Sequence, residues 1–322
     1  MSVQPGRSCP LHYRYAPEDF ERRPAIAADT LYVVGGLYGN GPALDAILDM
    51  AAAEPRPVVL AFNGDFNWFD ADAQSFRRIN ETVLRHVALR GNVETEIAAD
   101  GDDFGCGCGY PDWVGDAEVA RSNAILARLR DTARGHSDLQ TALGRLPMYA
   151  VAEVNGMRIA LVHGDATSLA GWSYAQERLC DDRHKAQVGQ HFERAGVRVI
   201  ASSHTCLPVA TDFVTSQGRC ILVNNGAAGM PNFRDTRYGL ITRIGAERSR
   251  GGVAAIYGTT VDALHVEALP VRYDHDGWMT AFLANWPAGS TAHESYHRRL
   301  ASGPAYALDA ATRWLPATAL VT

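Results

Sequence analysis

Apolar runs and amphipathic segments alternate along the first part of the chain. Short apolar runs at residues 31–34, 58–62 and 86–89 have the length and composition of buried strands. Between them, residues 42–53 and 71–84 have the apolar spacing of helices that bury one face. Strands that alternate with helices in this way predict an α/β sheet.

The alternation is interrupted after residue 95. Residues 95–115 are rich in acidic side chains and glycine and are expected to form an inserted loop, followed by a helix over residues 116–134. Two alternating runs, 148–154 and 157–163, flank Asn155-Gly156, and this arrangement predicts a β-hairpin.

The second half of the chain is expected to be mostly strands. A helical stretch within residues 168–195 comes first, and helices return from residue 277. The strands are predicted at residues 197–202, 220–224, 238–244 and 253–269.

Composition and charge exclude some classes of function. The chain has 322 residues and a formal net charge of -6, which argues against general nucleic-acid binding. No apolar stretch is long enough to cross a membrane, and the N-terminus lacks the apolar core of a signal peptide. The sequence therefore predicts a cytoplasmic protein without nucleic-acid or membrane partners. A small anionic substrate would need local help from a metal or a few arginines. A homo-oligomer is left open.

The six cysteines are sparse and do not resemble a disulfide framework, so they are expected to be thiols. Cys106 and Cys108 flank a glycine in the predicted insert, but no second pair has the spacing of a structural zinc site. We expect them to be reduced thiols in a flexible loop. A role for this loop as a lid is left open.

Four polar side chains come directly after predicted strands. They are Asp65, Asn92, His163 and His204. Each alone has a structural explanation, as a helix cap, a turn residue or a hydrogen-bonded histidine. Because strand ends of an α/β sheet meet at one edge, the four together favour a site for a divalent transition metal.

The order of these clusters resembles the calcineurin-like metallophosphoesterase family, in its bacterial type. The family signature runs D-x-H-G-N, G-D, G-N-H-E/D, H-G or G-H, and G-H-x-H. The first block is recognisable as Gly36-Leu37-Tyr38-Gly39-Asn40, and residues 225–231 resemble the N-P-G-S-x-G-x-P segment of bacterial members. The resemblance implies a four-layer α-β-β-α sandwich, with two mixed sheets flanked by helices. The expected organisation is an N-terminal extension at 1–29, a metallophosphoesterase-like domain at 30–270 with an insert at 95–135, and a C-terminal helical extension at 271–322.

Departures from the signature affect one of the two metal sites of the family. The positions of an Asp and two His ligands of the first site hold Gly36, Tyr38 and Cys206. The second site is complete, because its four ligand positions hold Asp65, Asn92, His163 and His204. The resemblance therefore implies one divalent ion, iron, manganese or zinc, in place of two.

Two further residues stand where the family has groups near the reaction. Tyr38 replaces a ligand and offers a phenol, and filling of the vacated space is the alternative explanation for it. The histidine that often follows Gly-Asn is Val93 here, with Glu94 after it. Tyr38 and Glu94 are the candidate catalytic residues.

The leading hypothesis is a metal-dependent hydrolase of a small phosphate ester, in which one metal activates water. Two alternatives remain. Asp65, His163 and His204 have the composition of a two-histidine, one-carboxylate site of mononuclear non-haem iron enzymes. The chain could also be a binding scaffold on the metallophosphoesterase fold that has lost catalysis and holds no metal.

Overall fold

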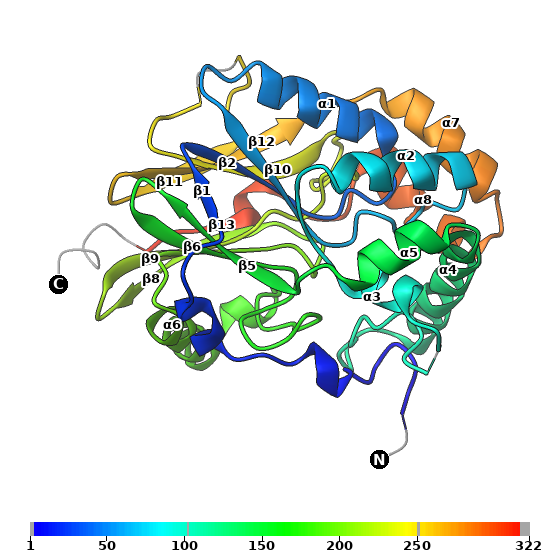
Figure 1. Cartoon of the computed structure of the whole chain (residues 1–322), viewed down its shortest axis with the longest axis horizontal. Helices are drawn as coiled ribbons and strands as arrows, with labels where there is room; N and C mark the ends of the chain where they lie inside the picture. The colour runs from blue at the N-terminus through cyan, green and yellow to red at the C-terminus, as the bar shows by residue number, and fades with distance from the viewer. Residues whose placement is uncertain (1–2, 102, 250–251, 316–322) are drawn as a thin grey trace.

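Two β-sheets pack face to face at the centre of the structure, a computed structural model that describes residues 3–101, 103–249 and 252–315 (Figure 1). Within these residues the larger sheet has seven strands, in the order β1 (Ile26–Ala28), β5 (Tyr149–Val154), β6 (Met157–Val162), β7 (Val199–Ser202), β9 (Gly218–Asn224), β8 (Val209–Thr215) and β13 (Thr312–Arg313). The smaller has six, in the order β11 (Tyr257–Val261), β12 (Leu264–Val271), β10 (Gly239–Gly245), β2 (Thr30–Val34), β3 (Val58–Asn63) and β4 (Val87–Leu89).

Both sheets are mixed, and each has a parallel core. In the smaller sheet β3 lies between β2 and β4 and is parallel to both, with Val33 opposite Ala61. In the larger sheet β7 is parallel to β6 and β9, with Ile200 opposite Leu222. Because they are parallel, β3 and β4 end at the same edge of the smaller sheet, and β6 and β7 end at the same edge of the larger sheet.

Helices cover the outer faces of the two sheets. The helix α1 (Gly41–Ala52) buries Leu44 and Ile47 against the smaller sheet. On the larger sheet, α6 (Asp182–Ala195) does the same with Val188 and Phe192. Between the sheets lies a third apolar cluster, which includes Val33 and Ile221. The result is the expected four-layer α-β-β-α sandwich.

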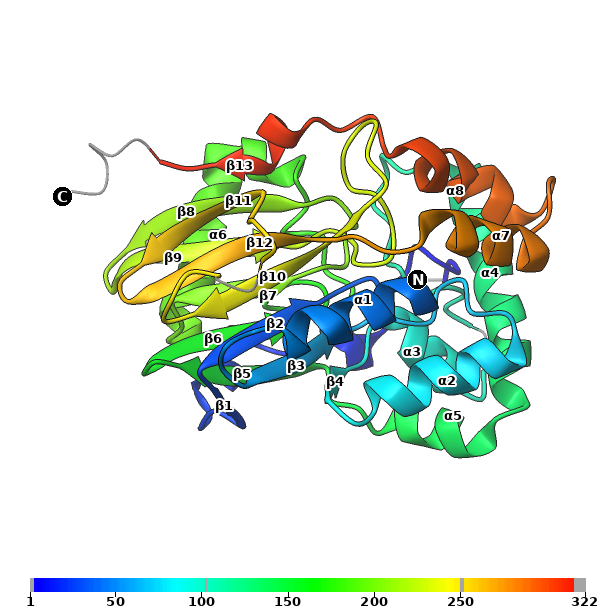
Figure 2. The same cartoon turned by 90° about the horizontal axis from the view of Figure 1, so that it is seen from above.

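The remaining helices gather beyond one end of the sheets (Figure 2). They are α2 (Ala73–Val83), α3 (Asn92–Ala98), α4 (Asp116–Arg134), α5 (Ser137–Gly144), α7 (His275–Asn285) and α8 (Thr291–Ser302). Short 3-10 turns occur at Leu11–Tyr13, Pro17–Glu21, Arg178–Cys180 and Leu308–Ala311. No helix among the residues with a described structure is long and apolar enough to cross a membrane.

Most of the predicted elements are present, with some differences. The predicted helix over 116–134 and the hairpin around Asn155-Gly156 are confirmed as α4 and as β5 with β6. Residues 253–269 were predicted as one strand, but they contain β11 and most of β12, which pair antiparallel after a turn at Asp262, whose φ is 49°. Residues 168–195 are only partly helical, because α6 begins at Asp182. The last residues of the expected C-terminal extension, 316–322, lie outside the described ranges.

Candidate metal centre

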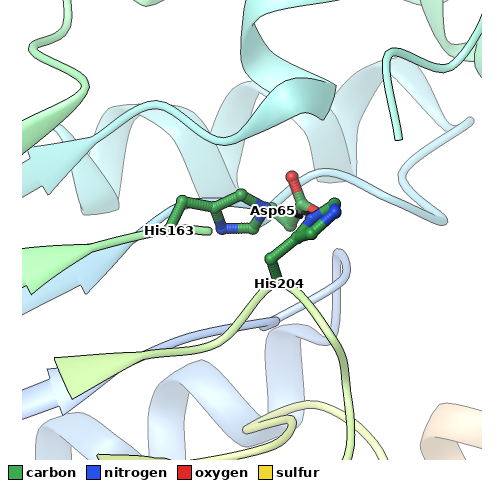
Figure 3. Close-up of side chains that lie close together, drawn as sticks. All are labelled: Asp65, His163 and His204. Carbon is green, nitrogen blue, oxygen red and sulfur yellow. Dashed lines mark hydrogen bonds and ion pairs between the residues drawn. The ribbon is translucent and has the colours of Figure 1, made fainter. Parts of the chain in front are cut away.

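The four polar residues predicted from the strand ends lie close together, but they come from both sheets. Asp65 and Asn92 follow β3 and β4 of the smaller sheet, whereas His163 and His204 follow β6 and β7 of the larger sheet. All four are buried. Figure 3 shows Asp65, His163 and His204 pointing toward one another from three separate loops. The expectation of a single sheet edge is therefore wrong, since two strand ends of each sheet meet where the sheets face each other.

The donor atoms have the spacing of a coordination shell. Nε2 of His163 lies 3.3 Å from Oδ2 of Asp65, 3.1 Å from Oδ1 of Asn92 and 3.0 Å from Nδ1 of His204. One ligand atom each from Asp65, His163 and His204 lies within 4.8 Å of the others. Neighbouring ligands on an ion with bonds of about 2.1 Å are separated by about 3.0–3.4 Å. These side chains therefore fit a single small cation.

In three of the candidate ligands, the side-chain nitrogen that faces away from the cluster is hydrogen-bonded to a backbone carbonyl. Nδ1 of His163 lies 3.0 Å from the oxygen of Asn63, Nε2 of His204 lies 3.0 Å from that of Cys108, and Nδ2 of Asn92 lies 2.9 Å from that of Cys106. Because a carbonyl only accepts, each outer nitrogen donates its hydrogen. In the neutral rings, Nε2 of His163 and Nδ1 of His204 therefore carry lone pairs, and these two atoms face each other. A histidine that binds a metal needs such a tautomer, with the lone pair on the nitrogen that faces the ion.

Charges in the site favour a positive group between the donors. Burial and the neighbouring His163 lower the pKa of His204 to about 4. Burial would also lower the pKa of His163, but the carboxylate of Asp65 outweighs it and raises this pKa. Two facing lone pairs repel unless a proton or a cation lies between them. The pair with Asp65 therefore provides a buried anionic pocket for one positive charge.

Glu94 is not directed at the centre of this cluster. Its buried carboxylate accepts hydrogen bonds from the backbone N–H groups of Asp65 at 2.7 Å, Phe66 at 3.0 Å and Gly91 at 2.9 Å. Burial, reinforced by the charge of Asp65, raises the pKa of Glu94 to about 7. These bonds tie the loop after β3 to the first turn of α3, so they fix the positions of Asp65 and Asn92.

At positions 36, 38 and 206 the structure brings together a phenol and a thiol. The hydroxyl of Tyr38 lies 2.9 Å from the sulfur of Cys206. A Cβ atom at Gly36 would lie 2.7 Å from the Tyr38 ring, so the ring occupies the space that a side chain at 36 would need. Burial raises the pKa of both Tyr38 and Cys206 above their usual values. Both groups keep their protons at neutral pH, and these positions therefore present no charged ligand.

The pair Cys106 and Cys108 differs from expectation. The structure joins them in a disulfide, and both side chains are buried. Gly107 between them has a φ of 64°, and a Cβ there would contact Tyr13 and Glu96. The prediction of reduced thiols in a flexible loop is wrong, because this segment packs against α3 and its two carbonyls bind Asn92 and His204. The other four cysteines are free.

A cavity opens directly on the cluster. Its floor includes Tyr38, Asp65, Asn92, His204 and Cys206. Its walls are mainly the aromatic side chains Trp68, Tyr110, Trp172 and Tyr296, together with Cys108. Sequence reasoning missed these aromatic residues. Only Trp68 is near a predicted ligand in sequence, and nothing in the spacing marks Tyr296 of α8.

Comparisons with known proteins bear on the fold. No protein-family model matches the sequence, and a search of curated proteins finds no match. Among solved structures, a hypothetical protein from Pyrococcus horikoshii is similar with a TM-score of 0.58 at 16% identity, covering 87% of this chain and 100% of that one. A metallophosphoesterase from Sphaerobacter thermophilus is similar with a TM-score of 0.53 at 16% identity, covering 86% of this chain and 100% of that one. The architecture predicted from the sequence motifs is thus confirmed, and this chain has the fold of the Sphaerobacter metallophosphoesterase.

Proposed function

We propose that this protein is a metal-dependent phosphoesterase that works with one divalent ion held by Asp65, Asn92, His163 and His204. The observation that carries the proposal is the approach of the His163 and His204 rings, whose facing nitrogens lie 3.0 Å apart. The other nitrogen of each ring is hydrogen-bonded to a backbone carbonyl. The fold of the chain and the cavity beside the cluster support the same conclusion. Two nitrogen and two oxygen donors suit zinc, manganese or iron.

The residues around the ion have separate roles. When bound, a divalent ion supplies a Lewis acid and brings the pKa of water towards about 7. Tyr38, a neutral phenol on the cavity floor, donates a hydrogen bond to a phosphoryl oxygen where the two-metal members of the fold have a second cation. Glu94 does not touch the substrate in this proposal. It is a positioning residue, because its carboxylate accepts a hydrogen bond of 2.7 Å from the backbone N–H of Asp65.

A mononuclear iron enzyme is the second candidate, because Asp65, His163 and His204 form a two-histidine, one-carboxylate cluster. Asn92 disfavours it, since Oδ1 lies 3.1 Å from the inner nitrogen of His163 and would occupy one of the open positions of such a site. Oxygen uptake after addition of iron(II) would favour the iron enzyme. Release of an alcohol from a phosphoester without oxygen uptake is the result expected here.

A matched pair of alanine variants tests the proposed hydrolase. His204→Ala removes a proposed ligand, whereas Cys206→Ala changes a neighbouring residue of the cavity floor that is not one. With bis(p-nitrophenyl) phosphate as substrate, we expect the first change to lower kcat/KM by more than about 100-fold and to remove the bound metal. The second should retain the metal and most of the activity. Equal losses in the two variants, or full activity of His204→Ala, would contradict the assignment.

A further inference from the structure

The walls of the cavity are aromatic, and they come from four distant segments of the chain. Trp68 lies in the loop after β3, Tyr110 between α3 and α4, Trp172 in the loop after β6, and Tyr296 on α8. Tyr110, Trp172 and Tyr296 are only half-buried. Ring surface is therefore left uncovered at the walls of a cavity whose floor is the candidate metal centre.

The rings are arranged in two pairs above this floor. The Trp172 ring stands edge-on to His204 at a centroid distance of 5.3 Å, and Tyr110 packs against Trp172 at 5.7 Å. Trp68 and Tyr296 form the second pair, edge-to-face at 6.3 Å. Aromatic faces and edges at such spacings bind a further planar ring by offset stacking or edge-to-face contact. The walls are suited to a flat, apolar group next to the reacting phosphate.

The charges of the cavity limit the charge of the ligand. Of the residues that line it, none is a lysine or arginine. Arg299 lies next to Cys206, but its guanidinium donates to the carbonyl oxygens of Cys206 at 2.6 Å and Pro231 at 3.2 Å. One divalent ion and the carboxylate of Asp65 sum to a charge of +1, and Glu94 beside them adds no positive charge. This balances a phosphate with a single negative charge, and a second buried negative charge would have no partner.

We propose that the substrate is a phosphodiester monoanion that carries a planar aromatic group, with its phosphate on the metal centre and its ring between the aromatic walls. This inference rests on the proposed function and adds the substrate class. Simple alkyl phosphates lack the ring, and phosphate monoesters carry the second charge. Both are expected to bind less tightly.

Two non-hydrolysable monoanions that differ only in the ring test the inference. Metal-loaded protein is titrated calorimetrically with dimethylphosphinate and with methyl(1-naphthyl)phosphinate. We expect the naphthyl compound to bind at least about tenfold more tightly. Tyr296→Leu should remove most of this preference while leaving the affinity for dimethylphosphinate within about twofold. Tyr110→Leu is the second wall variant, and Tyr238→Leu, which changes a half-buried tyrosine outside the cavity, is the matched control.

The outcomes separate this inference from the proposed function. If dimethylphosphinate binds and the naphthyl compound binds no better, or if Tyr238→Leu lowers the preference as much as both wall variants, the aromatic substrate is overturned alone. If 1-naphthylphosphonate, at a pH where it is a dianion, binds more tightly than the naphthyl phosphinate, the assignment to a diester is overturned. If neither phosphinate binds to metal-loaded protein, the proposed function fails, and this inference fails with it.

Discussion

Two pairs of side chains at the candidate centre differ in what they offer a cation. When neutral, the rings of His163 and His204 turn lone pairs toward each other, because backbone carbonyls accept hydrogen bonds from their outer N–H groups. Tyr38 and Cys206 form a pair that burial keeps protonated. The first pair, with the carboxylate of Asp65, attracts a cation, whereas the second offers only neutral groups. This difference is the physical basis for the proposal that one metal ion is bound in place of two.

A substitution at Tyr38 tests whether its hydroxyl takes part in the proposed reaction. Tyr38→Phe keeps the ring that fills the space above Gly36 and removes only the hydroxyl. If that hydroxyl stabilises charge on the phosphoryl group, kcat should fall by about 100-fold with little change in KM. Metal content should stay the same, and steady-state kinetics together with metal analysis measure both. An unchanged kcat would assign Tyr38 to space filling alone.

The sequence indicated which candidate ligands lie close together better than it indicated the groups around them. Asp65, Asn92, His163 and His204 could be found because each follows an apolar strand. The position of the Glu94 carboxylate could not be predicted from the sequence. This carboxylate accepts a hydrogen bond from the N–H of Gly91 in the first turn of α3, and that local contact competes with contacts to a ligand in the cavity. Roles for Tyr38 and Glu94 in the chemistry stay predictions.

Among the elements, the segment that holds Cys106 and Cys108 has the most direct influence on the donors. Its two carbonyls bind Asn92 and His204, and the indole of Trp172 also donates to the carbonyl of Cys108, at 2.9 Å. The disulfide closes a short turn at this place. This segment thus orients two proposed ligands and one wall of the cavity.

Opening this turn should weaken metal binding. We expect the double variant Cys106→Ser with Cys108→Ser to lower metal affinity by about 10- to 100-fold, the usual cost of disturbing groups that orient ligands. Competition with a chromogenic chelator measures the affinity. Cys180→Ser changes an exposed, free cysteine and serves as control. An affinity unchanged in the double variant would show that the turn is held without the disulfide.

Elements with a clear period were predictable, and those with polar interruptions were not. The helix α4 has the predicted bounds, and the hairpin turn at Asn155-Gly156 lies where the dipeptide indicated. The strand β8 was missed, because Asp212 interrupts its apolar pattern. In the structure this carboxylate is buried and bonds Arg219 of the neighbouring β9 at 2.9 Å. A local pattern does not reveal such a cross-strand partner.

At the scale of the whole molecule, the site depends on the packing of the two sheets. Each sheet supplies two of the four donors, so the centre exists only when the sheets face each other. Strand–helix alternation predicted an α/β sheet, and the motifs predicted the two-sheet sandwich. Neither could show that α8, in the expected C-terminal extension, brings Tyr296 to the cavity. That contact joins segments far apart in sequence.

The location and number of bound ions test the central claim most directly. Anomalous diffraction from crystals grown with manganese or zinc would show them without any assumption about the reaction. We predict one peak per chain, coordinated by Asp65, Asn92, His163 and His204, and no peak between Tyr38 and Cys206. The absence of a peak among those four donors, or a second ion at Tyr38 and Cys206, would contradict the account.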